Sequence, residues 1–198
     1  MHKDLESLLA EIRRLEDQLE DHWDSLRQRF DYTLQDGKVR FESAVVETHR
    51  RLRDGLFGYV ARARLSHLLT APVIYALIVP LVFLDICVMI YQHICFRAYD
   101  IAIVQRKDYI VIDRNRLGYL NGLQKLNCVY CGYAGGLISY VQEVIARTEQ
   151  YWCPIKHARR VRNRHSRYAK FSEYGDATNY HVHLKDLRKE LADEKAGK

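Results

Sequence analysis

The amino-acid sequence predicts a mainly α-helical, membrane-anchored protein with a small metal-binding α+β region. Three observations lead to this fold class: one long apolar run, helical spacing of apolar residues on both sides of it, and a C-x-x-C pair followed by a third cysteine. The mean hydropathy of the 198-residue chain is only −0.32, which does not fit a protein with many spans. The apolar content therefore indicates one anchor.

Residues 1–42 form the first predicted region, a charged amphipathic helix followed by a possible hairpin. The pair Asp36-Gly37 stands between two alternating runs and indicates the turn of a β-hairpin, although a helix that continues is the alternative. Within the helix, spacings of three and four alternate over residues 5–26, which is a heptad pattern. This seam predicts either self-association or packing on the chain's own surface. Its members are Leu5, Leu8, Ile12, Leu15, Leu19, His22 and Leu26.

Residues 43–67 have the pattern of a basic amphipathic helix, which can lie in the plane of a membrane interface. Residues 68–91 are the anchor, because about 1.5 Å per residue carries them across a hydrocarbon core of about 30 Å. Pro72 and Pro80 also permit a re-entrant bend. Basic residues are balanced on the two sides of the anchor, so the positive-inside rule gives no orientation.

Residues 92–175 are predicted to fold as a Cys-rich metal-binding domain, and residues 176–198 as a charged C-terminal helix and tail. Within the domain, residues 109–112 are a strand candidate and residues 114–127 look helical. Three glycines then predict a break before a helix over residues 137–148. These glycines are Gly132, Gly135 and Gly136.

The cysteines predict the metal site. Cys128 and Cys131 form a C-x-x-C pair, and Cys153 with His157 adds a second ligand pair in the order C-x3-H. Three thiolates and one imidazole suit tetrahedral zinc, with iron as the alternative metal. Cys95 is the alternative fourth ligand. A redox-active dithiol and inert packed thiols are the competing interpretations.

The segment CVYCGY followed by WCP resembles the paired metal-binding knuckles of rubredoxins. The resemblance covers about thirty residues and implies a mononuclear iron held by thiolates. Lys156 stands where the fourth cysteine of that family is found, which favours zinc in this chain. The stretch from Asp108 to about Arg160 also resembles uncharacterised bacterial inner-membrane proteins. That likeness implies the inner membrane. We expect the metal site on the cytoplasmic side, because five cysteines in a chain with no cleavable signal peptide indicate reduced thiols.

Two further features carry functional hypotheses. Asp85 lies within the apolar run, where a carboxylate is costly, and it either pairs with a cation, is protonated or marks the interface. A dense basic run follows Cys153 and favours contact with anionic lipids over nucleic acid, although a solvated surface explains it as well. The predicted lipid contacts are Arg159, Arg160, Arg162, Arg164 and Arg167.

The sequence therefore predicts a membrane-anchored interaction or assembly factor that binds a structural zinc ion. Its predicted partners are anionic lipids and, through residues 5–26, a second copy or another protein. No motif for a specific reaction is found, so the prediction leans away from an enzyme. The alternatives are an iron electron carrier, a thiol–disulfide oxidoreductase that uses Cys128 and Cys131, and a scaffold that depends on Ile12 and Leu15.

Overall fold

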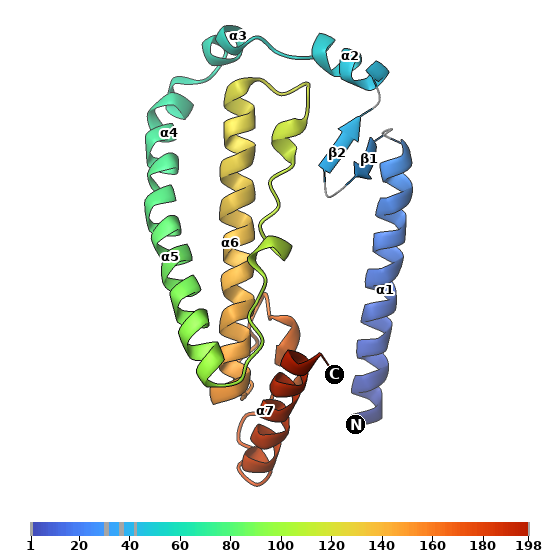
Figure 1. Ribbon diagram of the computed structural model, residues 1–198, viewed down its shortest axis with the longest axis vertical. Helices are drawn as coiled ribbons and strands as arrows, with labels where there is room; N and C mark the ends of the chain where they lie inside the picture. Colours follow the sequence, from blue (N-terminus) through green and yellow to red (C-terminus); the bar gives the residue numbers. More distant parts are fainter. Residues whose placement is uncertain (1, 30–31, 36–37, 42, 198) are drawn as a thin grey trace. The chain divides into compact units, whose positions relative to one another are not determined.

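The computed structural model describes residues 2–29, 32–35, 38–41 and 43–197 of the chain, and it is mainly helical (Figure 1). The chain divides into two compact units. The first consists of Met1–Arg62 with Asp113–Leu126, and the second consists of Ala63–Ile112 with Asn127–Lys198. The second unit contains the apolar helix and all five cysteines.

The first unit begins with helix α1 (His2–Arg29), which is continuous over the predicted heptads. Strands β1 (Tyr32–Gln35) and β2 (Lys38–Phe41) follow and pair antiparallel, with Leu34 opposite Val39. The alternation of apolar residues on each side of the turn is consistent with this pairing. The Asp36-Gly37 pair that predicted the turn lies outside the described residues.

The single helix predicted over residues 43–67 is wrong. The structure has α2 (Ser43–Arg51) and α3 (Leu56–Ala61), and residues 65–67 already belong to the next helix. The break falls at Gly55, which is extended with φ −66° and ψ 138°, in agreement with the low helix propensity of glycine. An ion pair of 2.9 Å between Arg62 and Asp54 ties the linker to the end of α3.

The second unit begins with α4 (Leu65–Ala76), α5 (Ile78–Tyr91) and a π-helical turn at Gln92–Phe96. Together they form one helix, Leu65–Phe96, that contains the predicted anchor. The ends of α4 and α5 meet at Leu77 because Pro80 has no N–H for the carbonyl of Ala76 and its ring crowds that carbonyl. Pro72 lies inside α4 without ending it.

The apolar side chains of this helix are largely exposed. Only 11% of its most apolar window is buried by the rest of the protein. Exposed side chains include Val73, Val79 and Phe83, at 69%, 70% and 69%. A helix in water that is apolar on every side would be covered by protein. By length and composition, Leu65–Phe96 can cross a membrane.

After the π-helical turn, residues 97–121, called the returning chain, run back in the direction opposite to α5 and lead into α6 (Gly122–Trp152), which runs in the same direction as α4 and α5 (Figure 1). In the described part of this stretch the structure has 3₁₀ turns at Arg106–Asp108 and Arg114–Arg116. The predicted strand at residues 109–112 is therefore wrong, and the α+β region that included it is not supported. Of the predicted helix at 114–127, residues 114–116 form a 3₁₀ turn and residues 122–127 belong to α6. Tyr109 and Ile110 pack against α6 at Gly136 instead of pairing with a neighbouring strand.

Helix α6 also runs without interruption through the glycines that predicted a break. At Gly136 an added Cβ would lie 2.5 Å from the carbonyl oxygen of Tyr109 and 2.8 Å from Cα of Ile110. Glycine thus allows the returning backbone to touch the helix. At Gly135 an added Cβ would meet nothing within 4 Å.

The last helix described is α7 (Tyr180–Ala196), which lies within the predicted C-terminal region of residues 176–198. Between α6 and α7 the chain forms a loop that is closed by two backbone hydrogen bonds, Lys156 N–H to Ser172 O at 2.8 Å and Ser172 N–H to Pro154 O at 2.9 Å. The core of the unit joins α5, the returning chain, α6 and α7. Its buried residues are Phe96, Ile101, Val104, Leu137, Tyr140, Val141, Val144 and Leu191.

We expect Gly136→Ala to lower the free energy of unfolding by about 1–3 kcal/mol, because the new methyl group meets backbone atoms that cannot move independently. Gly135→Ala is the matched control and should be neutral or stabilising by up to about 1 kcal/mol, since alanine is the better helix former and has room. Chemical unfolding in a non-ionic detergent, followed by circular dichroism, measures both. Equal stability of the two variants would contradict the close approach at Gly136.

Candidate functional site

Asp85 is the centre of the polar site in the apolar helix. Its exposed fraction is 4%, and its carboxylate faces the returning chain and α6. The guanidinium of Arg106 donates from Nε to Oδ1 at 3.1 Å and from Nη2 to Oδ2 at 2.6 Å. The Tyr133 hydroxyl donates to Oδ2 at 2.9 Å. The hypothesis that Asp85 pairs with a cation is therefore confirmed by these contacts.

The cation comes from an element that the sequence did not connect with Asp85. Arg106 begins the 3₁₀ turn of the returning chain, and its side chain is 42% exposed. Its guanidinium carbon also lies 5.9 Å from the centre of the Tyr133 ring. A forked contact of this kind fixes the carboxylate and the guanidinium in one plane, which adds geometric specificity to the charge interaction. No periodicity or spacing in the sequence predicts this pair.

A second polar contact joins the returning chain to the apolar helix. It is made by Gln92, which follows Asp85 on that helix. The buried Gln92 side chain accepts a hydrogen bond from Val104 N–H at 3.2 Å and donates to the Tyr140 hydroxyl at 2.5 Å. Gln92 opens the π-helical turn at the end of α5. Buried amides in an apolar core are costly unless both ends find partners, and here both do.

Tyrosine hydroxyls connect the apolar helix with α6 at further levels. Tyr130 donates to the carbonyl of Ile74 at 2.8 Å, and the hydroxyls of Tyr91 and Thr148 lie 2.9 Å apart. Tyr75 donates to the side chain of Asn127. Together with the contacts of Asp85 and Gln92, these hydrogen bonds follow both helices in the same direction. The two helices are therefore parallel neighbours that share a polar seam within an otherwise apolar contact.

The structure does not assemble the predicted metal site. Cys128 and Cys131 lie within α6, one turn apart, and Cys153 follows the end of that helix. At about 1.5 Å per residue, the helix separates the pair from Cys153 by more than about 30 Å. The prediction of one site from these three thiols is therefore wrong. The C-x-x-C segment that resembles a rubredoxin knuckle is helical here.

The other predicted ligands have different surroundings. His157 stacks on Tyr168, with ring centres 6.0 Å apart, and its backbone N–H donates to the Tyr168 hydroxyl at 2.7 Å. Cys95 belongs to the π-helical turn at the end of α5. Partial desolvation raises the pKa of the Cys153 thiol, and the charge of Glu149 adds to this effect. A thiol with a raised pKa is a weaker metal ligand at neutral pH.

Among the described residues no group of three or more His, Cys, Asp or Glu side chains is placed to hold a metal ion. Neither cysteine of the C-x-x-C pair lies in the first turn of α6, where a helix N-terminus would favour a thiolate. The described residues thus show neither a cluster of ligands that would support the zinc prediction or its iron alternative, nor a helix N-terminus that would support the dithiol alternative.

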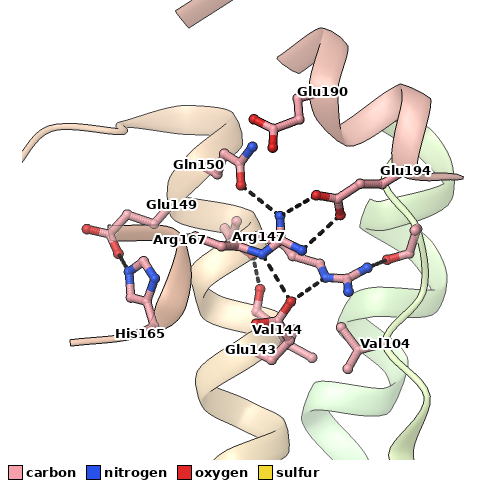
Figure 2. A network of polar contacts seen from close by, with 12 residues as sticks. Val104, Glu143, Val144, Arg147, Glu149, Gln150, His165, Arg167, Glu190 and Glu194 are labelled. Atoms are coloured by element: carbon pink, nitrogen blue, oxygen red, sulfur yellow. Dashed lines mark hydrogen bonds and ion pairs between the residues drawn. The ribbon is translucent and has the colours of Figure 1, made fainter. Parts of the chain in front are cut away.

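The predicted lipid contact Arg167 is instead the centre of an internal ion-pair network (Figure 2). Its side chain is only 11% exposed. It donates to Glu143 Oε1 at 3.0 Å, to Gln150 Oε1 at 2.8 Å, and to both carboxylate oxygens of Glu194 at 3.0 and 2.8 Å. The network joins α6, the loop and α7, so the prediction for Arg167 is wrong.

Arg147 extends this network to the returning chain, as Figure 2 shows. It donates to Glu143 Oε1 at 2.8 Å and to the carbonyl of Ala102 at 2.8 Å. Beside it, His165 and Glu149 approach to 3.0 Å. One end of α6 therefore holds three segments that are distant in sequence.

Only part of the basic run remains at the surface. Arg159, Arg160, Arg162 and Arg164 are exposed. The guanidinium of Arg164 lies 5.2 Å from the centre of the Tyr168 ring, and its Nε donates to the carbonyl of Val161. Lys156 pairs with Glu173 at 2.5 Å, and Lys170 pairs with Glu190. The run therefore mainly makes contacts that fix the loop, and the three arginines at its beginning have no ion pair among the described residues.

Comparison of the chain with protein-family models, with curated proteins and with solved structures found no match in any of the three.

We expect Arg106→Gln to lower the free energy of unfolding by about 3 kcal/mol, because Asp85 is then buried without its cation. The double variant Asp85→Asn/Arg106→Gln should recover part of this loss, since the charge itself is removed. Tyr133→Phe should cost about 1 kcal/mol. Thermal unfolding in detergent measures all three, with the exposed Arg97→Gln as the control. A double variant that is less stable than Arg106→Gln would contradict the pairing.

The Glu194–Arg167 contact predicts an acid-sensitive contribution to stability. Burial acts to raise the pKa of Glu194, but the hydrogen bonds and charge of Arg167 outweigh it, and the net pKa is lowered. A lowered folded-state pKa gives stability that is complete above the unfolded pKa of about 4.3 and is lost as the pH falls through the folded value. The stability difference between the wild type and Glu194→Gln should therefore shrink below about pH 4.3. Glu173→Gln, at a carboxylate that is 74% exposed, should show no such change.

Proposed function

We propose that this chain is a membrane-anchored interaction factor, held in the bilayer by Leu65–Phe96 and presenting α1 for association. The observation that carries the proposal is the helix itself, which is long, apolar on every side and largely exposed. An interfacial helix would have one polar face, and this helix does not. Its one buried charge is neutralised within the chain by Arg106.

The C-terminal end of the apolar helix supports this placement. Tyr99 stacks on Tyr151 at 5.1 Å and meets Trp152 edge-on at 5.3 Å, and Trp152 is 49% exposed. Such aromatic groups are typical of the membrane–water boundary. Arg159, Arg160 and Arg162 follow in the same unit and are suited to anionic head groups, each contributing about 1 kcal/mol near a charged surface.

The association surface is the heptad seam of α1. Leu8, Ile12, Leu15 and Leu19 are 61%, 51%, 51% and 48% exposed, and His22 is exposed as well. The side chains of Leu5 and Leu26 lie outside the described part of the structure. Of the two alternatives for the seam, this exposure favours association over packing on the chain itself. Ile12 at an a position and Leu15 at the following d position suit a two-stranded coiled coil, so the proposed partner is α1 of a second copy.

The proposal is tested with the full chain in native membranes, with photoreactive benzoylphenylalanine in place of Leu15. We expect an adduct of twice the chain mass, from protein that resists extraction at alkaline pH. Adding Ile12→Glu should reduce the adduct at least tenfold, because a charge enters the apolar seam. The matched control carries the photoreactive group in place of Asp17, on the opposite face of α1.

This experiment tests the membrane anchor and the self-association of α1 separately. Release of the protein by alkaline extraction would contradict the membrane anchor. An adduct with a different protein, or equal adducts from positions 15 and 17, would contradict the self-association of α1.

A further inference from the structure

The stretch Gln105–Ile112, called the return segment below, lies at the same level as Asp85 in the apolar helix. Arg106 contacts the Asp85 carboxylate directly. Three residues later, the backbone of Tyr109 and Ile110 touches α6 at Gly136. The return segment is therefore fixed beside both helices and cannot be moved out of the bilayer independently of them.

The position of the membrane along Leu65–Phe96 decides whether this level lies in the hydrocarbon region. A crossing needs about 20 residues. Any such stretch within Leu65–Phe96 contains residues 77–84, so Asp85 lies inside the stretch or next to its end. Where the crossing stretch extends past Asp85, the return segment enters the hydrocarbon region, and the inference below rests on that placement of the proposed span.

Direct contact with lipid would leave polar backbone groups of such a segment without hydrogen-bond partners. The backbone of the return segment is irregular except for the 3₁₀ turn Arg106–Asp108. Irregular backbone occurs at membrane depth only where protein or water covers it. Helices α5 and α6 cover one side. Several side chains are nevertheless exposed: Gln105, Lys107, Asp108, Val111 and Ile112.

The exposed side chains indicate what covers them. Lys107 and Asp108 are adjacent, opposite in charge and without an ion pair among the described residues. About a two-fold axis, Lys107 of each copy meets Asp108 of the other, so one symmetric contact neutralises four charges. Val111 and Ile112, 55% and 41% exposed, supply apolar surface beside them. We infer that a second copy of this chain covers the return segment through Lys107–Asp108 pairs within the bilayer, an inference that rests on the proposed membrane span.

The test uses the full chain carrying Ile12→Glu and Leu15→Glu, so that α1 does not contribute to association. The protein is reconstituted in vesicles of phosphatidylcholine and phosphatidylglycerol, and copies per complex are counted by single-molecule photobleaching as the protein is diluted in lipid. We expect dimers. Lys107→Asp and Asp108→Lys should each weaken the dimer at least tenfold, because like charges then face each other. The double exchange Lys107→Asp/Asp108→Lys should restore it to within about threefold.

A matched control comes from Lys185 and Asp186, an exposed pair of the same kind on α7, outside the apolar helix. The same exchanges there should leave the dimer unchanged. Flotation of each variant with the vesicles, together with its helical circular dichroism, establishes that it is inserted and folded. Vesicle-bound protein that is monomeric, or a double exchange that fails to restore the dimer, overturns the inference and leaves the anchor standing. Protein that does not float with the vesicles refutes the anchor itself.

Discussion

The second unit is organised around the need to neutralise one carboxylate. A charge on an apolar helix is tolerated only when a partner is fixed beside it, and Asp85 obtains Arg106 and the Tyr133 hydroxyl. Arg106 reaches it because the chain reverses after α5 and runs back along the helix. Gln92 and Gly136 make that path possible, the first by binding Val104 and the second by leaving room for backbone.

Helix α6 is the element on which all other parts of this unit converge. Along its length, tyrosine hydroxyls bond to the apolar helix, and at its far end Glu143, Arg147 and Gln150 bind the loop and the returning chain. Polar groups that would be costly in an apolar contact thus occur in pairs with partners on a neighbouring segment. The orientation of the two helices is specified by these pairs, because apolar contact alone accepts many registers.

Local patterns predicted the parts of the fold that depend on local chemistry. The apolar run, the heptads of α1 and the C-terminal helix all follow from the spacing of apolar residues within one segment. The C-x-x-C pair could not be read in the same way, since two cysteines three residues apart fit one turn of a helix as well as a metal-binding turn. Gly136 was misread because close packing and a chain break require the same residue.

The partners of charged residues were the least predictable part. The sequence singled out Asp85, but Arg106 gave no signal that distinguished it from the other arginines near the anchor. Arg167 was misassigned for a related reason. A basic run has the same composition whether its side chains face lipid head groups or carboxylates of the same chain, and only the fold places Glu143 and Glu194 beside Arg167.

The order of these residues along the chain has a consequence for biosynthesis. Arg106 is 21 residues behind Asp85, and Tyr133 is 48 residues behind it. At a synthesis rate of about 5–20 residues per second, the carboxylate waits roughly 1–4 s for its cation and roughly 2–10 s for the phenol. During that interval the nascent helix carries an uncompensated charge. If the helix enters a bilayer as proposed, the insertion machinery shelters Asp85, or the carboxyl stays protonated, until the ribosome has delivered both partners.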